Sequence, residues 1–199
     1  MPAGRLVLLR HGETEWSRSG QHTGRTDIPL TPRGEEQARA VGQALTDFSF
    51  VLTLSSPLER ARRTAELAGL TPEVDDDLLE WDYGGYEGLT TAEIRENLGY
   101  DWSVFRDGVV PGERSRGETV EEVAGRVSRV VARAIDAMAD GDVVLVGHGH
   151  CSRVLATVFL QQEPRMGAKL LLDAGSLSVL EYEREEPAIR VWNQPARTS

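Results

Sequence analysis

The sequence predicts an α/β fold in which a mostly parallel sheet lies between two layers of helices, and three observations support this prediction. Apolar runs at residues 5–9, 50–54 and 142–146 lack regular polar positions, as expected of strands buried on both faces. Helical patterns separate these runs. The chain has 199 residues, 40% of them hydrophobic, which is enough for one core but short for two. We therefore expect one three-layer α/β/α domain over residues 1–199.

Three helices are predicted between and after the strands. The first, at residues 31–44, begins with Thr31-Pro32 and has Glu35 in its first turn. The second covers residues 57–68, and the third covers residues 119–138. The third has an apolar face at helical spacing, formed by Val120, Val123, Val127, Val130, Val131 and Ala134. A strand-helix-strand-helix order is typical of a parallel sheet.

Two further segments complete the prediction. Residues 84–117 contain several glycine, aromatic and arginine residues around short helical patterns, so we expect a lid-like insertion rather than a separate domain. Near the end of the chain, residues 176–182 and 188–192 flank a turn-prone segment. They predict a hairpin at the edge of the sheet.

The charge and the single cysteine exclude several classes of function. The net charge is −10, with 22 basic against 32 acidic residues, which disfavours nucleic acid as a partner. The apolar run at residues 5–9 is too short for a signal-peptide core or a membrane span, so no membrane partner is expected. Cys151 is the only cysteine, and we interpret it as a small buried residue in a cytoplasmic protein.

Residues suited to phosphate chemistry follow each predicted strand. Arg10 and His11 follow the first, a segment ending in Arg60 follows the second, and His148 follows the third. Ligands in open α/β sheets bind beyond the carboxyl ends of the strands, so we expect these side chains to converge. A neutral imidazole is a competent nucleophile toward phosphorus, and arginines bind phosphoryl oxygens by paired hydrogen bonds. The sequence therefore predicts a phosphate pocket around His11, with Gly12 letting the backbone approach the ring.

A phosphate-transferring site also needs a general acid for the leaving oxygen. Glu80 is the best candidate, because it lies in an aromatic segment, residues 78–88, after the second helix. Asp82 and Glu87 in the same segment compete for this role. The local pattern does not decide between them.

Neither a metal ion nor a cofactor is expected. His148 and His150 are close in sequence, but on a strand-to-helix turn their rings point apart, and no third ligand has a recognisable spacing. The predicted activity is therefore metal-independent.

Residues 9–16, Leu-Arg-His-Gly-Glu-Thr-Glu-Trp, resemble the signature of the histidine phosphatase superfamily, the phosphoglycerate mutase-like proteins. Residues 23–31, 55–61, 78–88 and 146–149 resemble further motifs of this family in order and spacing. The resemblance spans nearly the whole chain. It implies a phosphoglycerate mutase-like fold and an activity that passes through a phosphohistidine.

Carried over position by position, the resemblance implies that His11 is phosphorylated and that Glu80 donates the proton. Arg10, Arg60 and His148 would complete the phosphate pocket. The resemblance also implies that Thr23, Gly24, Tyr83 and Gly149 bind the substrate.

Two departures from the family pattern bear on the activity. Ser17 stands where many members have an asparagine that holds the phosphate, and its hydroxyl is expected to act through water. Trp81 replaces the arginine that binds the substrate carboxylate in phosphoglycerate mutases. The second departure favours hydrolysis over mutase activity.

Residues 11–31, 80–84, 102–108 and 172–175 are most similar to the branch with fungal sedoheptulose-1,7-bisphosphatase and actinobacterial acid phosphatases. This similarity implies a small phosphorylated metabolite, a sugar phosphate or bisphosphate, as substrate. Trp102 and Arg106 are candidate selectors, with helix packing and a surface ion pair as their alternative roles.

Two other functions stay open at this stage. A phosphoglycerate mutase would use the same His11 and Glu80 but return the phosphoryl group to the organic product. A catalytically silent module would only bind a phosphorylated ligand. The oligomeric state is also open, with a homodimer among the alternatives.

Overall fold

A six-stranded sheet in the order β3-β2-β4-β1-β5-β6 forms the centre of the computed structural model, which describes residues 2–195. The predicted domain limits, 1 and 199, lie outside the described residues. Strands β1 to β4 pair in parallel, whereas β5 and β6 form the predicted antiparallel hairpin at the edge. The strands are β1 (Leu6–Arg10), β2 (Phe50–Ser55), β3 (Glu73–Val74), β4 (Asp142–Gly147), β5 (Ser176–Glu183) and β6 (Glu186–Pro195). The prediction of a mostly parallel α/β sheet is confirmed.

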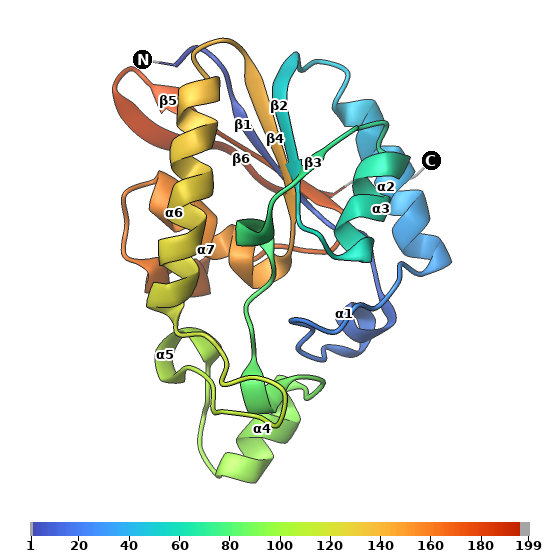
Figure 1. Cartoon of the computed structure of the whole chain (residues 1–199), viewed down its shortest axis with the longest axis vertical. Coiled ribbons are helices and arrows are strands. Elements are labelled where there is room, and N and C mark those ends of the chain that lie inside the picture. Colours follow the sequence, from blue (N-terminus) through green and yellow to red (C-terminus); the bar gives the residue numbers. More distant parts are fainter. Residues whose placement is uncertain (1, 196–199) are drawn as a thin grey trace.

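Helices cover both faces of this sheet (Figure 1). The α-helices are α1 (Glu15–Ser19), α2 (Pro32–Ala44), α3 (Glu59–Leu67), α4 (Thr91–Leu98), α5 (Val104–Asp107), α6 (Val120–Ala137) and α7 (Gly149–Phe159). Short 3₁₀ helices are η1 (Asp76–Leu78), η2 (Gly84–Tyr86) and η3 (Pro164–Lys169). Three of the α-helices, α2, α3 and α6, match the helices predicted from sequence. Thr31 caps α2 by accepting a hydrogen bond from the Gly34 N–H, with Pro32 as the first helical residue.

The sequence predicted a strand-to-helix turn at His148 and His150 but not the extent of helix α7, and the burial of this helix explains why. Residues on several sides of this helix are buried, among them Cys151, Ser152, Leu155 and Phe159. A helix buried on most sides has no polar face to reveal its period in the sequence.

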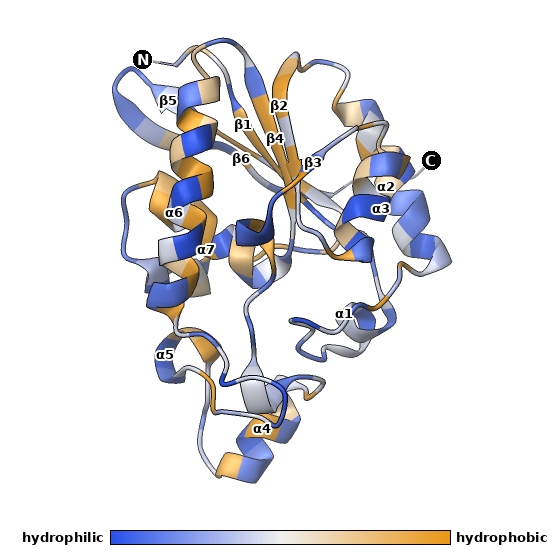
Figure 2. Ribbon diagram, viewed as in Figure 1, coloured by the Kyte–Doolittle hydropathy of each residue, from blue (hydrophilic) through white to orange (hydrophobic). Residues whose placement is uncertain are grey.

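The core has two parts, one on each face of the sheet. Along β1, Leu6 and Leu8 pack with α6 and α7, while Val7 and Leu9 pack with α2 and α3. Figure 2 shows the apolar strands enclosed between the two helical layers, whose outer surfaces are largely polar. Because both faces of β1 are covered, its sequence shows no polar alternation.

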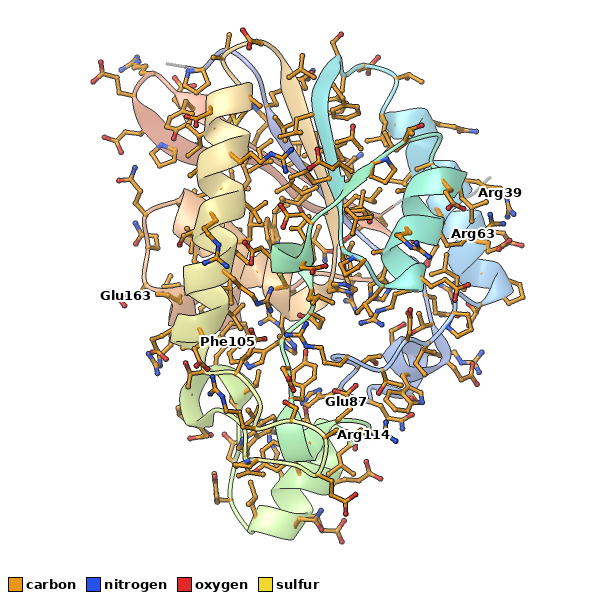
Figure 3. All side chains as sticks on the ribbon, in the orientation of Figure 1. Arg39, Arg63, Glu87, Phe105, Arg114 and Glu163 are labelled. Atoms are coloured by element: carbon orange, nitrogen blue, oxygen red, sulfur yellow. The ribbon has the colours of Figure 1, made fainter. Side chains whose placement is uncertain are left out.

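The parallel strands end at one edge of the sheet, and because they run in the same direction, the loops that follow them lie together there. Arg10 at the end of β1 pairs with Gly147 at the end of β4, and Ser55 at the end of β2 pairs with Val146. Residues 84–117, called the lid segment below, project beyond this edge (Figure 1). Phe105, labelled in Figure 3, joins the lid segment to the core packed around α6 and α7. Within residues 2–195, no helix combines the length and apolar character needed to cross a membrane.

Candidate active site

The loops after β1, β2 and β4 meet as predicted. The N–H of His11 donates to the Gly147 carbonyl at 3.0 Å, and the N–H of Ser56 donates to the Val146 carbonyl at 3.0 Å. The His11 and His148 rings consequently lie with their centroids 5.2 Å apart. The backbone of β4 thus ties the other two loops to one place.

His11 is held in a single tautomer. Its Nδ1 lies 2.7 Å from the Gly12 carbonyl oxygen, and because a carbonyl can only accept, Nδ1 carries the hydrogen and Nε2 keeps its lone pair. Burial, followed by the charges of Arg60 and Arg10, holds the pKa of His11 well below its usual range. The ring is therefore neutral at neutral pH, as a nucleophile requires.

Gly12 has a packing role in addition to the one predicted. A Cβ atom at Gly12 would lie 2.2 Å from the Gly34 carbonyl oxygen at the start of α2. The small residue is therefore needed for the close approach of α2 to this loop, and its own carbonyl lies 2.7 Å from the His11 ring.

His148 is fixed by Arg60, which lies fully buried beneath the site. The Arg60 Nε donates to His148 Nδ1 at 3.2 Å, since a guanidinium cannot accept. The hydrogen of His148 is then on Nε2, which donates to the Ser56 hydroxyl at 2.7 Å. A phosphoryl oxygen that takes the place of this hydroxyl would accept a hydrogen bond from His148 Nε2.

Arg10 lies against the first turn of α7. One of its terminal nitrogens donates to the Leu172 carbonyl, whereas its buried Nε has no hydrogen-bond partner among the described residues. A Cβ atom at Gly149 would lie 3.3 Å from the Arg10 guanidinium carbon. A glycine at position 149 therefore leaves room for the arginine to enter the pocket.

Glu80 is held by backbone donors from two segments. Its Oε1 accepts from the N–H of Trp81 at 2.8 Å and of Cys151 at 2.7 Å, and its Oε2 accepts from the N–H of His150 at 3.0 Å. Two of the three donors come from the first turn of α7. The carboxyl group is therefore fixed beside the loop that carries His148.

The two competing carboxylates serve the surrounding loops instead. Asp82 accepts from the Gly84 N–H and the Ser115 hydroxyl. Glu87, which is labelled in Figure 3, accepts from the N–H groups of Gly24 and Thr26. Of the three candidates, Glu80 is the one that lines the cavity.

A cavity of about 200 Å³ opens over this group, and Arg10, His11 and Glu80 line it. Arg60 and His148 lie behind its wall. Four of the predicted substrate-binding residues, Ser17, Thr23, Tyr83 and Gly149, line the cavity.

Ser17 and Gly24 differ from the expectation. Ser17 lines the cavity, but its hydroxyl accepts from the Thr14 N–H at 2.8 Å and donates to the Thr14 carbonyl at 3.0 Å, so it caps α1. Gly24 is outside the lining, and a Cβ there would lie 2.6 Å from the Trp81 carbonyl oxygen. Its carbonyl accepts from Arg60 at 3.0 Å, so Gly24 supports the pocket from behind.

Sequence reasoning missed several lining residues, namely Gln21, His22, His150, Arg153 and Leu172. His150 and Arg153 are three positions apart on α7 and share one face of that helix. Prediction of the extent of the helix after the Gly-His-Gly turn would have revealed them. The hydroxyl of Tyr83 lies 2.5 Å from His150 Nδ1, which fixes the wall of the cavity.

Trp81, which departs from the family pattern, and the candidate selectors Trp102 and Arg106 lie in different places. Trp81 is fully buried and donates from Nε1 to the Glu118 carbonyl at 2.8 Å, so it packs in the core. Trp102 is also buried and donates to the Gly108 carbonyl at 3.0 Å. Arg106 is exposed and paired with Asp107 at 2.9 Å. Within the described part of the chain, no group of three or more His, Cys, Asp or Glu residues is arranged to hold a metal ion.

Comparison with known proteins supports the same chemistry. Residues 6–195 match the histidine phosphatase superfamily (branch 1). The chain is 42% identical to an acid phosphatase of Mycobacterium tuberculosis, over 90% of this chain and 87% of that protein. It is 37% identical to sedoheptulose 1,7-bisphosphatase of Saccharomyces cerevisiae, over 78% of this chain and 67% of that protein.

A solved structure agrees with these relatives. The structure of the open reading frame Rv3214 from Mycobacterium tuberculosis superposes with a TM-score of 0.91 at 39% identity, covering 98% of this chain and all of that one. Fold, strand-end histidines and sequence thus agree over nearly the whole chain, and the protein belongs to the histidine phosphatase superfamily.

Proposed function

We propose that this protein hydrolyses small phosphorylated metabolites, sugar phosphates or bisphosphates, through a phosphohistidine on His11. The observation that carries the proposal is the hydrogen bond from His11 Nδ1 to Gly12, which leaves the Nε2 lone pair free in a cavity shared with Arg10 and Glu80. The sugar bisphosphate activity named for the yeast relative supports the substrate class.

In the first step, Nε2 of His11 attacks phosphorus and the bond from phosphorus to the ester oxygen breaks. Arg10 binds the phosphoryl oxygens from the cavity, and Arg60 and His148 complete the phosphate pocket from behind its wall and offset the charge that develops. A protonated Glu80 gives its proton to the leaving alkoxide, which departs as an alcohol.

In the second step, the Glu80 carboxylate takes a proton from water while the water oxygen attacks phosphorus. The phosphorus–nitrogen bond breaks, inorganic phosphate leaves, and both His11 and Glu80 return to their starting states. His11 thus acts first as the nucleophile and then as the leaving group, and Glu80 acts first as the acid and then as the base.

The mutase alternative lacks a carboxylate-binding group at position 81. Trp81 is fully buried, and its indole N–H donates a hydrogen bond to the Glu118 carbonyl. Because an indole carries no positive charge, it cannot replace an arginine in binding the carboxylate of a phosphoglycerate. Incubation with 3-phosphoglycerate and a bisphosphoglycerate primer separates the two activities. Efficient isomerisation with little free phosphate would overturn hydrolysis as the main activity.

The test of the proposed function is a brief exposure to a labelled sugar phosphate followed by denaturation. We expect acid-labile label on the wild type and on Glu80→Gln, and none on His11→Ala. Glu80→Gln should release sugar slowly but hydrolyse an aryl phosphate, whose leaving group needs no proton, with a smaller loss. A chain that takes up no label and releases no phosphate from a broad panel would be a silent binding module.

We also propose that the protein acts in the cytoplasm, since its single cysteine is a buried thiol. Cell fractionation tests this location. Light scattering decides between a monomer and a homodimer.

A further inference from the structure

Arg153 is a partly buried cation at the active site. It lies on α7 and lines the cavity that contains His11. Its Nε donates to the Gly167 carbonyl at 2.8 Å, and its guanidinium lies 4.7 Å from the centre of the Phe105 ring. Among the described residues, no carboxylate forms an ion pair with it, and burial lowers the pKa of the Arg153 guanidinium.

Arg10, which lines the same cavity, also forms no ion pair within residues 2–195, although the chain has 32 acidic residues. Away from this cavity the buried Arg126 is paired with Glu118 at 2.8 Å. Glu80, the acidic residue that shares the cavity, is already bound by three N–H groups. Burial of a charge without a partner costs stability, so the position favours a charge supplied by a ligand.

Arg153 also stands between two cavities. The cavity over His11 measures about 200 Å³, which is smaller than the roughly 300–1,000 Å³ of most small-molecule sites. A second cavity of about 430 Å³, walled by the lid segment, shares His22, His150 and Arg153 with the first. In that second cavity the charge of Arg95 is paired with Asp101 at 2.8 Å.

The phosphoryl group that reacts at His11 already has two cations near it, Arg10 and Arg60, whose charges both act on the His11 ring. Arg153 is therefore a third cation, next to the space that would hold the body of the substrate. From this geometry we infer that Arg153 binds a second phosphoryl group of the substrate, so that the enzyme prefers sugar bisphosphates to monophosphates; this inference rests on the proposed function. Because this group does not react, Arg153 should contribute binding rather than catalysis, and its loss should raise KM with little change in kcat.

The experiment compares fructose 1,6-bisphosphate, fructose 6-phosphate and an aryl phosphate with the wild type, Arg153→Gln and Arg153→Lys. Wild type should prefer the bisphosphate in kcat/KM by about 10-fold or more, the value of a hydrogen bond to a charged group. Arg153→Gln should lose this preference because its KM for the bisphosphate rises. Its kcat/KM for the aryl phosphate should stay within about twofold of wild type. The preference of Arg153→Lys should lie between those of wild type and Arg153→Gln. Arg165→Gln, which removes an exposed arginine paired with Glu121, is the control. It should change neither the preference for the bisphosphate nor the activity on the aryl phosphate.

Several results would overturn the inference. A wild type without preference for the bisphosphate would do so whether or not the variants fold. An equal loss on all three substrates in Arg153→Gln would assign Arg153 to structure, and a preference for 3-phosphoglycerate over the bisphosphate would assign it to a carboxylate. Failure of the proposed function looks different, because then the wild type releases phosphate from none of these substrates.

Discussion

Arg60 has an acceptor for each of its guanidinium nitrogens. Nε donates to His148, Nη1 donates to the Thr26 carbonyl at 2.8 Å, and Nη2 donates to the carbonyls of Thr23 and Gly24. Only a planar fork with five N–H groups can serve these directions together. Arg60 therefore sets the tautomer of His148 and also holds the loop that forms one wall of the cavity.

We expect Arg60→Lys to fail in both roles, although it keeps the charge. The free energy of unfolding should fall by about 1.5–3 kcal/mol for each charged hydrogen bond lost, and kcat should fall by roughly 10²-fold as for removal of a preorganised donor. Urea denaturation and steady-state kinetics measure the two effects. Arg39, which is labelled in Figure 3, forms an exposed ion pair with Glu35, and Arg39→Lys should stay within about 0.5 kcal/mol of wild type. Near-wild-type activity in Arg60→Lys would contradict the role given to the fork.

At the scale of elements, α6 positions the segment that carries Glu80. Arg126 on α6 donates to the carbonyls of Asp77, Leu79 and Glu80 at 2.7, 2.6 and 3.1 Å. Its charge is paired with Glu118, which in turn accepts from the Asp82 N–H at 2.9 Å. Both ends of the Glu80 segment are thus bound to one buried ion pair.

Arg126→Met should release this segment and leave Glu118 with only the more distant Arg25, at 3.6 Å, as an ion-pair partner. We expect a loss of about 3–5 kcal/mol in the free energy of unfolding, the usual result of breaking a buried ion pair. In the fraction that folds, kcat should fall more for a sugar phosphate than for an aryl phosphate, because the proton donor is displaced. Arg129→Met, on the exposed side of α6 with Asp77 as partner, is the matched control. Equal losses on both substrates would exclude a positioning role.

Across the whole molecule, all four histidines have lowered pKa values and lie in or behind one site. Burial lowers the pKa of His22 to about 4, and burial with nearby arginines holds the pKa values of His11, His148 and His150 well below their usual range. Below about pH 6.5 the unfolded chain binds protons at these positions that the folded chain does not. Stability should therefore fall as the pH drops below about 6.5, by up to about 1.4 kcal/mol per pH unit for each histidine.

Urea denaturation between pH 7.5 and 5 measures this dependence. His22→Phe offers a direct check, because phenylalanine retains the stacking on Tyr83, where the His22 ring centroid lies 4.7 Å away, and cannot titrate. We expect a smaller slope of stability against pH in this variant. An unchanged slope would show that His22 does not titrate on unfolding in this range.

The sequence by itself determined all the strands of the sheet except β3, three of the long helices and the residue types at the strand ends, because these depend on local periodicity and on the order of elements along the chain. Only the tertiary structure decided which carboxylate faces the cavity, since Glu80 is fixed by N–H groups of α7 up to 71 positions away. The same holds for the tautomers of His11 and His148 and for the place of Arg153 between two cavities. These features arise from contacts between distant segments, and no local pattern records such contacts.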